Sequence, residues 1–459
     1  MVIPDLRLDA CNAQPLRPER DFVLYWMIAA RRTRWNFGLQ RAIERARELR
    51  KPLVVLEPLN ADYRWACDRF HRFVIDGMEA NHRALRGKPA LYHPYVEPAP
   101  GHGKGLLAAL SKRACLIVTD EYPCFMLPKL VAAAAGKVDV RLEQVDSNGL
   151  LPLRATEKVF LTAASFRRFL QKHLGPHLAE TPAPDPFRGV RLPRLRQLPE
   201  ELGRRWPAAR FPVDLSRLPI DHGVAPTSTR GGQDEARRVL ERFLRERLAA
   251  YAEERNEPER EGSSGFSPYL HFGHLSAHEV HARLAKRHAD AFLDQLVTWR
   301  ELGFNLCSKR PDYDQYRSLP LWCRTTLAEH ARDPRPIRYS RDEFESAATH
   351  DPLWNAAQVQ LVREGRIHNY LRMVWGKKIL EWSESPEAAL ATMIELNNKY
   401  ALDGRDPNSY SGIFWILGRY DRAWGPVRPV FGKIRYMSSE NTARKFRVKD
   451  YVARYATLR

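Results

Sequence analysis

The sequence lacks the features typical of disulfide-rich, metal-binding and membrane-spanning proteins. Its six cysteines are scattered, with no CxxC pair and no zinc-ligand spacing, so the pattern predicts neither a disulfide framework nor a metal site. No apolar run approaches the roughly 18 residues that a membrane span requires, and the N-terminus has no apolar signal core. We therefore expect a cytoplasmic protein with no membrane partner and no obligate protein partner.

Acidic residues are in the minority. The 74 lysines and arginines outnumber the 55 aspartates and glutamates, which gives a formal net charge of +19. Because phosphate neutralisation by basic side chains dominates nucleic-acid affinity, this balance favours a nucleic acid as the partner. The alternative is a basic surface that only reflects an arginine-rich composition.

The length of 459 residues predicts two or three domains. Short apolar runs alternate with helical patterning in the first third of the chain, at 22–29, 52–56, 90–95, 115–119 and 138–145. This alternation predicts an α/β, Rossmann-like domain with a parallel sheet over residues 20–175. A segment rich in proline and arginine, 176–232, is expected to be a connector. Helical periodicity then predicts an all-α domain over 233–459.

Small hydroxyl residues and glycines precede a predicted helix in the string GSSGFSPYLHFGHLS, residues 262–276. Exposed N–H groups and hydroxyls at a helix start suit a pyrophosphate. An ordinary helix cap is the alternative interpretation, because serine and glycine are common before helices.

Aromatic and polar residues share two predicted helices between 351 and 408. Asn369, Arg372 and Trp375 recur at a spacing of three residues, so they lie near one helix face. A buried arginine needs a carboxylate, and Asp403 is the best candidate, either beside a cofactor or as a structural pair that closes a helical hairpin. Rings, amides and one ion pair suggest a buried redox cofactor, whereas core packing is the usual role of such tryptophans.

The strings IHNYLRMVW (367–375), KKILEW (377–382) and LDGRDPN (402–408) closely resemble the photolyase/cryptochrome flavoproteins, specifically the class II CPD photolyases. The resemblance covers nearly the whole chain and implies a C-terminal FAD-binding catalytic domain. The residues that match the cofactor-binding positions are Tyr251, Ser263, Ser264, Gly265, Phe266, Ser267, Asn369, Arg372, Asn397 and Asp403. It also leaves open a second, antenna chromophore of deazaflavin or folate type in the N-terminal domain.

The resemblance assigns catalytic roles to four residues. Asn397 resembles the amide that faces the flavin N5, and Asn398 beside it is an alternative candidate for that position. The structural interpretation is that the two residues form an exposed asparagine pair at a helix end. Trp375 and Trp354 match an electron-transfer dyad. Trp382 assists or merely packs, and Tyr339 is a weaker candidate for the surface end of the route.

Further residues resemble the substrate contacts of the family. Trp299 and Trp415 match residues that stack against a flipped pyrimidine dimer, although core packing is again the alternative. Gln295 stands where the family has an acidic residue, with Asp294 adjacent, so the protonatable partner of the lesion is in doubt. In the basic, aromatic segment 421–446 the expected DNA contacts are Lys433, Arg435, Arg444 and Lys445.

The resemblance thus implies light-dependent repair of cyclobutane pyrimidine dimers in double-stranded DNA by electron transfer from reduced FAD, in a cytoplasmic protein that associates with the nucleoid if its source is prokaryotic. A cryptochrome-like flavin photoreceptor without repair activity is the first alternative. A light-independent DNA-binding protein whose tryptophans only fill the core is the second, and flavin absorbance of the purified protein excludes it.

Overall fold

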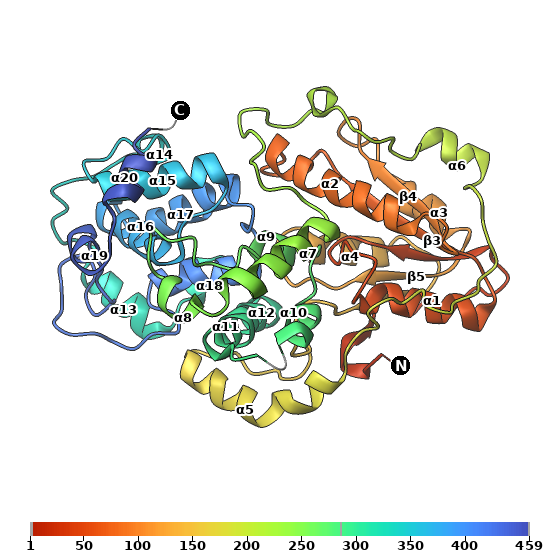
Figure 1. Ribbon diagram of the computed structural model, residues 1–459, viewed down its shortest axis with the longest axis horizontal. Helices are drawn as coiled ribbons and strands as arrows, with labels where there is room; N and C mark the ends of the chain where they lie inside the picture. Colours follow the sequence, from red (N-terminus) through yellow and green to blue (C-terminus); the bar gives the residue numbers. More distant parts are fainter. Residues whose placement is uncertain (1–2, 285–286, 458–459) are drawn as a thin grey trace. The chain divides into compact units, whose positions relative to one another are not determined.

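The computed structural model describes residues 3–284 and 287–457 (Figure 1). The chain forms two compact units. The first comprises Met1–Thr156, His173–Glu241 and Phe266–Arg287, and the second comprises Glu157–Lys172, Arg242–Gly265 and His288–Arg459. No helix among the described residues is long and apolar enough to cross a membrane.

A six-stranded sheet forms the core of the first unit, with the strand order β1-β6-β5-β2-β3-β4. The strands are β1 (Leu8–Ala10), β2 (Phe22–Trp26), β3 (Leu53–Leu59), β4 (Leu91–Val96), β5 (Ala114–Asp120) and β6 (Leu142–Val145). All neighbouring pairs are parallel except β1 with β6, which is antiparallel. After the edge strand β1, the parallel part of the sheet starts in the middle at β2, builds outward to β4 and then returns to β5, so the direction of winding reverses between β2 and β5.

Helices cover both faces of this sheet. Alternate residues of β2 face opposite sides, so Leu24 and Trp26 pack with α3 (Leu106–Ser111), α4 (Leu127–Ala135) and α6 (Glu200–Arg205). Val23 and Tyr25 pack on the other face with α1 (Phe37–Leu49) and the end of α2 (Asp68–Leu85). Because both faces are buried, the strands read as continuous apolar runs in the sequence rather than as alternating patterns.

Polar side chains fix the loops at the carboxyl edge of the sheet. Asp120, the last residue of β5, accepts hydrogen bonds from the backbone N–H groups of Ile28, Ala29 and Ala30 at 2.8 to 2.9 Å. The adjoining crevice has a cavity volume of only about 10 Å³. The protein therefore fills the topological switch point, where ligands of such sheets commonly bind, with its own carboxylate.

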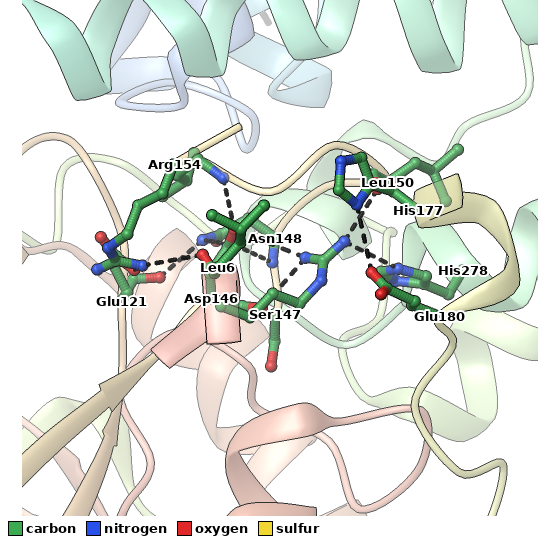
Figure 2. Close-up of polar contacts among 12 residues, drawn as sticks. Leu6, Glu121, Asp146, Ser147, Asn148, Leu150, Arg154, His177, Glu180 and His278 are labelled. Atoms are coloured by element: carbon green, nitrogen blue, oxygen red, sulfur yellow. Dashed lines mark hydrogen bonds and ion pairs between the residues drawn. The ribbon is translucent and has the colours of Figure 1, made fainter. Parts of the chain in front are cut away.

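The loop after β6 is held by a buried ion pair (Figure 2). The Arg7 guanidinium lies 3.6 Å from an Asp146 carboxylate oxygen and donates to the Leu150 carbonyl oxygen at 2.9 Å. Arg154 pairs with Glu121 at 2.8 Å. Burial and, secondarily, the charge of Asp146 raise the pKa of Glu121 to about 7. Figure 2 shows His278 on the opposite side of this network from Glu121. His278 Nε2 lies 3.4 Å from the Arg7 guanidinium.

The second unit is built largely of helices. Its principal ones are α12 (Arg300–Lys309), α13 (Leu321–Glu329), α15 (Pro352–Glu364), α16 (Asn369–Trp382), α17 (Pro386–Tyr400) and α18 (Pro407–Ile416). Shorter helices are α8 (Tyr251–Glu254), α11 (Asp290–Leu293), α14 (Arg341–Glu345), α19 (Ser439–Lys445) and α20 (Lys449–Arg454). Two stretches, Phe243–Arg247 and Asp294–Trp299, have π-helical geometry.

The remaining helices are α9 (Ser267–His271) and α10 (Ala277–Leu284), which belong to the first unit, and α5 (Ala163–Ala179) and α7 (Gln233–Arg242), which each include residues of both units. Short 3₁₀ turns lie at Asp5–Arg7, Leu215–Arg217 and Tyr316–Ser318. The region 233–459, where helical periodicity predicts an all-α domain, includes residues 285 and 286, which lie outside the described part of the chain.

The predicted fold class is confirmed, because a sheet covered by helices precedes a helical region. The predicted parallel sheet is confirmed for β2 to β6, and the short edge strand β1 adds an antiparallel pairing with β6. The segmentation at 20–175, 176–232 and 233–459 stays a prediction. The compact units differ from this segmentation, because residues 266–287 belong to the first unit. Long-range packing decides that assignment, and local sequence pattern does not show it.

Candidate functional site

Four helices of the second unit, α15 to α18, carry seven of the predicted site residues: Trp354, Asn369, Arg372, Trp375, Trp382, Asn397 and Trp415. A Cβ atom at Gly376 in α16 would lie 2.2 Å from the Ile416 side chain in α18 and 2.9 Å from the Met393 sulfur in α17. Only glycine permits this close approach without a shift of the neighbours. The packing brings the residues of α16 next to those that end α18.

The predicted ion pair is present. Arg372, in the second turn of α16, donates from Nη2 to both carboxylate oxygens of Asp403 at 3.1 and 3.3 Å. Asp403 lies in the turn between α17 and α18, and each side chain keeps 17% of its surface exposed. The pair therefore neutralises its own charge while one side stays accessible to a bound group.

The two asparagines near the end of α17 are both buried, which excludes an exposed pair. Asn397 Nδ2 donates to the Ser409 hydroxyl at 2.7 Å, and within the described chain its amide oxygen has no hydrogen-bond donor. Asn398 is fully engaged, since its oxygen accepts from the Arg405 backbone N–H at 2.9 Å and its nitrogen donates to Tyr410. Asn398 therefore has a structural role, and Asn397 is the residue with an acceptor left for a ligand.

The predicted phosphate loop, residues 262–267, has glycines at positions where the backbone is closely packed or has a positive φ. A Cβ atom at Gly262 would lie 2.6 Å from the Glu254 backbone, and Gly265 has a φ of +75°. Ser263 and Ser264 are half-buried between these glycines, and the Ser263 carbonyl oxygen accepts from Arg247 at 3.2 Å. Two of the predicted contacts, Phe266 and Ser267, belong to the first unit.

Tyr251 anchors the start of this segment. Its ring contacts Phe243 and Phe292 edge-on, with centroids 5.7 and 5.2 Å away. Burial raises the pKa of the Tyr251 phenol. Asn369, by contrast, is exposed at the first position of α16.

Hydrogen bonds and ring contacts link the predicted electron-transfer tryptophans. The Trp375 indole N–H donates to Gln358 Oε1 and the Trp354 indole N–H donates to the Trp375 carbonyl oxygen, both at 2.9 Å. The rings of Trp354 and Trp382 meet edge-on at 6.1 Å, and those of Trp382 and Tyr339 at 5.5 Å. The three indoles are buried, whereas Tyr339 is partly exposed and its hydroxyl shares a hydrogen bond with His350 Nδ1 at 2.6 Å. The rings therefore lead from the helix core to the surface.

A separate pair of indoles lines a pocket in the second unit. Trp299 and Trp415 stack on each other with centroids 4.7 Å apart and ring planes 25° apart, and both are half-buried. They line a pocket of about 170 Å³ together with Gln295 and Asn369. Partial exposure at a pocket wall does not fit the core-packing interpretation of these two residues.

Gln295 and Trp299 both belong to the π-helical stretch Asp294–Trp299. They are four positions apart, so they share one face of it, as they would in an α-helix. Such π-helical turns are frequent at functional sites. The same turn brings Trp299 Nε1 to the Asp294 carboxylate at 3.2 Å. Arg167 binds that carboxylate as well, at 3.0 Å. The pocket is thus lined by the neutral amide of Gln295, while Asp294 is engaged elsewhere.

The predicted DNA contacts in the basic segment 421–446 are exposed cations. Lys433, Arg435, Arg444 and Lys445 all have exposed side chains, and Arg435 also lines the pocket. The Arg435 guanidinium lies 5.1 Å from the Trp424 ring centroid, and Lys445 lies 5.3 Å from that of Tyr370. Cations held over aromatic rings are well placed to meet phosphates or bases.

Sequence reasoning missed several pocket residues. Met373 and Lys377 follow Asn369 at intervals of four, so all three lie on one face of α16 and line the pocket. Asp421, Arg255 and Asn256 complete the polar lining. The spacing of four residues from Asn369 and Met373 was the available signal for Lys377. The other three lie outside α16 and have no local signal.

Known proteins with similar sequences identify the family. The chain is 37% identical to the deoxyribodipyrimidine photo-lyase of Methanothermobacter thermautotrophicus over 95% of both chains. It is 36% identical to the deoxyribodipyrimidine photo-lyase of Oryza sativa subsp. japonica, over 94% of this chain and 87% of that protein. No protein-family model matches the chain.

A solved structure has the same fold. The class III photolyase from Agrobacterium tumefaciens matches with a TM-score of 0.67 and 17% identity, over 96% of this chain and 87% of that chain. The chain therefore belongs to the photolyase/cryptochrome family. The members quoted above are all named photo-lyases, so the prediction of a photolyase-type enzyme is confirmed. Membership of the family implies an FAD cofactor.

Proposed function

We propose that this protein repairs cyclobutane pyrimidine dimers in DNA under light, with FAD as its cofactor, as a class II enzyme of its family. The observation that carries the proposal is the pair of half-buried, stacked indoles, Trp299 and Trp415, at the wall of a pocket that also contains Asn369 of α16. Stacking of a base on an aromatic ring contributes about 1 to 3 kcal/mol. A dimer flipped out of the duplex finds planar apolar faces and polar side chains in one place.

The residues of the second unit fit a flavin. The Arg372–Asp403 pair stabilises a ring system that changes its charge, and the free amide oxygen of Asn397 can accept from a ring N–H. Ser263, Ser264 and the tightly packed Gly262 suit the pyrophosphate of a dinucleotide. When bound, FAD supplies the electron that opens the dimer and takes it back.

The tryptophan chain supports a route by which electrons reach the cofactor from the surface. Trp375 is the inner member, Trp354 and Trp382 follow, and Tyr339 is the outer end. The buried indole N–H groups of Trp354 and Trp375 each have an acceptor, which fixes both rings in place.

The DNA partner is bound through charge. The net charge of +19 and the exposed cations Lys433, Arg435, Arg444 and Lys445 favour contact with the phosphates of double-stranded DNA. Charge-based binding positions the duplex, whereas the Trp299 and Trp415 pocket selects the lesion. A second chromophore of deazaflavin or folate type stays a prediction from the family resemblance, as does a cytoplasmic, nucleoid-associated location.

Repair of defined oligonucleotides tests the proposal. One strand carries a single cyclobutane thymine dimer, a second carries a (6-4) lesion, and both are incubated with chemically reduced holoprotein in light and in darkness. We expect loss of the cyclobutane dimer only in light and no loss of the (6-4) lesion. A yellow, flavin-containing protein that repairs neither would instead be a cryptochrome-like photoreceptor.

A further inference from the structure

Lys377 is a buried cation at the pocket that holds the two stacked indoles. It belongs to α16, keeps only 3% of its surface exposed and lines the pocket with Trp299 and Trp415. Its neighbour Lys378 differs, because it pairs with Glu381 at 3.0 Å and lies over the Trp382 ring. A buried lysine without such a carboxylate partner is costly, so its position needs an explanation.

The Lys377 ammonium is bound to the end of the helix that carries Trp415. Nζ donates to the Ile416 carbonyl oxygen at 2.5 Å, and Ile416 is the last residue of α18. A cation suits this position because the free carbonyl groups make a helix C-terminus negative. The close contact at Gly376 holds α16 against the Ile416 side chain and so fixes this arrangement.

The Lys377 ammonium has N–H groups that are available to a ligand. It carries three N–H groups, and within the described chain only one of them has a protein acceptor, the Ile416 carbonyl oxygen. The remaining two are available to a ligand in the pocket. A ligand that stacks on indoles and accepts hydrogen bonds from an ammonium is a planar ring with carbonyl oxygens, as in a pyrimidine.

Charges of both signs lie near Lys377. Asp421, on the segment after α18, favours the ammonium, whereas Arg435 disfavours it, and the Cys323 thiol of α13 also faces it. Burial is the largest effect and lowers the pKa of Lys377 to about 7. A pyrimidine carbonyl that accepts a hydrogen bond from the charged form would raise it again.

We propose that Lys377 is the cationic anchor of the dimer pocket, where its ammonium donates to a carbonyl oxygen of the flipped pyrimidine dimer and stabilises the negative charge that the ring carries while it holds the transferred electron. This role rests on the proposed repair function. It also accounts for Gln295, because a pocket that contains a lysine cation has a charged donor without an acidic side chain at that position.

Dark binding to DNA tests the anchor without any photochemistry. Holoprotein is titrated with a fluorescent duplex that carries one cyclobutane dimer and with the undamaged duplex of the same sequence. Lys377→Met preserves volume and removes the charge, and Lys378→Met is the matched control. We expect Lys377→Met to weaken binding to dimer DNA by roughly 10- to 100-fold, the range of a hydrogen bond to a charged group, with undamaged DNA unaffected. Lys378→Met should leave both affinities unchanged.

The pH profile separates a charged anchor from a packing residue. In the wild type the preference for dimer DNA should fall as the pH rises from 6.5 to 9, because the free protein loses the ammonium above about pH 7. In Lys377→Met the preference should be low and independent of pH. Equal profiles in the two proteins, or equal loss of both DNA affinities, would overturn the anchor. A wild type that shows no preference for dimer DNA at any pH would refute the proposed function itself.

Discussion

At the scale of single residues, charged and amide side chains of the site use only part of their hydrogen-bonding capacity within the described chain. Arg372 has Asp403, and Asn397 has Ser409, but each pair keeps capacity for a ligand. Asn398, one position on, is saturated by Arg405, Tyr410 and Asn397. Two adjacent and identical residues thus differ in function because of the hydrogen bonds that the fold gives them.

The Arg372–Asp403 pair leads to a prediction on cofactor retention. Asp403→Asn leaves the guanidinium without its carboxylate, so the charge beside the cofactor is no longer balanced. We expect FAD to be held at least about 10-fold more weakly, measured as the absorbance ratio of flavin to protein after dialysis. Asp312→Asn is the control, since Asp312 pairs with Arg310 at 2.8 Å outside the predicted site residues. Full flavin content in Asp403→Asn would contradict the assignment.

At the scale of elements, α15 and α16 hold the tryptophan chain. Asp351 caps α15 by accepting from the backbone N–H groups of Leu353 and Trp354 at 3.0 Å, so the cap and the first buried indole are fixed together. Gln358, one turn further along α15, accepts from the Trp375 indole of α16. The spacing of the indoles is therefore set by two helices and not by either alone.

A substitution in α16 tests whether this chain carries electrons. Trp375→Phe keeps an aromatic ring but removes the oxidisable indole nearest to the proposed cofactor. We expect photoreduction of the oxidised holoprotein to slow at least 10-fold, followed by its absorbance under blue light with an external reductant. Repair by chemically reduced protein should stay within about two-fold of wild type.

Trp322→Phe serves as the control for this prediction. Trp322 lies in α13, and no ring contact in the described structure joins it to the chain of Trp375, Trp354 and Trp382. Its photoreduction should match the wild type. Unchanged photoreduction in Trp375→Phe would show that the indoles are core residues only.

At the scale of the whole molecule, buried neutral histidines couple stability to pH. Burial lowers the pKa of His274 in the first unit to about 3 and that of His368 in the second unit to about 4. His274 Nδ1 accepts from the Gly232 backbone N–H at 2.9 Å, which requires an unprotonated nitrogen. Both units thus contain a histidine that favours unfolding when it takes up a proton.

The sign of the pH dependence follows from these shifts. In the unfolded chain these histidines bind protons near pH 6.5, and in the folded chain they do so only near pH 3 to 4. Their contribution to the free energy of unfolding is therefore fully present above pH 6.5 and is lost as the pH falls. At pH 5 the loss reaches about 2 kcal/mol per histidine. We expect a lower apparent Tm at pH 5 than at pH 7.5 in calorimetry.

His368→Gln isolates one of the two contributions. The amide does not titrate, so the difference in Tm between pH 7.5 and pH 5 should shrink. His350→Gln, at an exposed position, should leave that difference as in the wild type. A pH dependence that is the same in all three proteins would mean that His368 does not contribute.

Local sequence pattern predicted the elements well where burial is uniform. The apolar runs of β2, β3 and β5 are buried on both faces, so composition alone marks them as strands. The three-residue strand β1 has a mixed burial pattern and pairs only at one edge, so no local signal distinguishes it from a loop. The π-helical turn at Asp294–Trp299 likewise cannot be told from an α-helix by periodicity.

The sequence by itself determined the residue types of the site and, through its resemblance to a family, their roles. It placed Arg372 and Asp403 as partners because a buried cation requires a nearby carboxylate. Only the tertiary structure decided which groups are satisfied: it saturated Asn398, directed Asp294 to Arg167, and brought Lys377 to the end of α18 beside Trp415. Hydrogen bonds and burial depend on contacts between residues far apart in the chain, and local patterns do not contain that information.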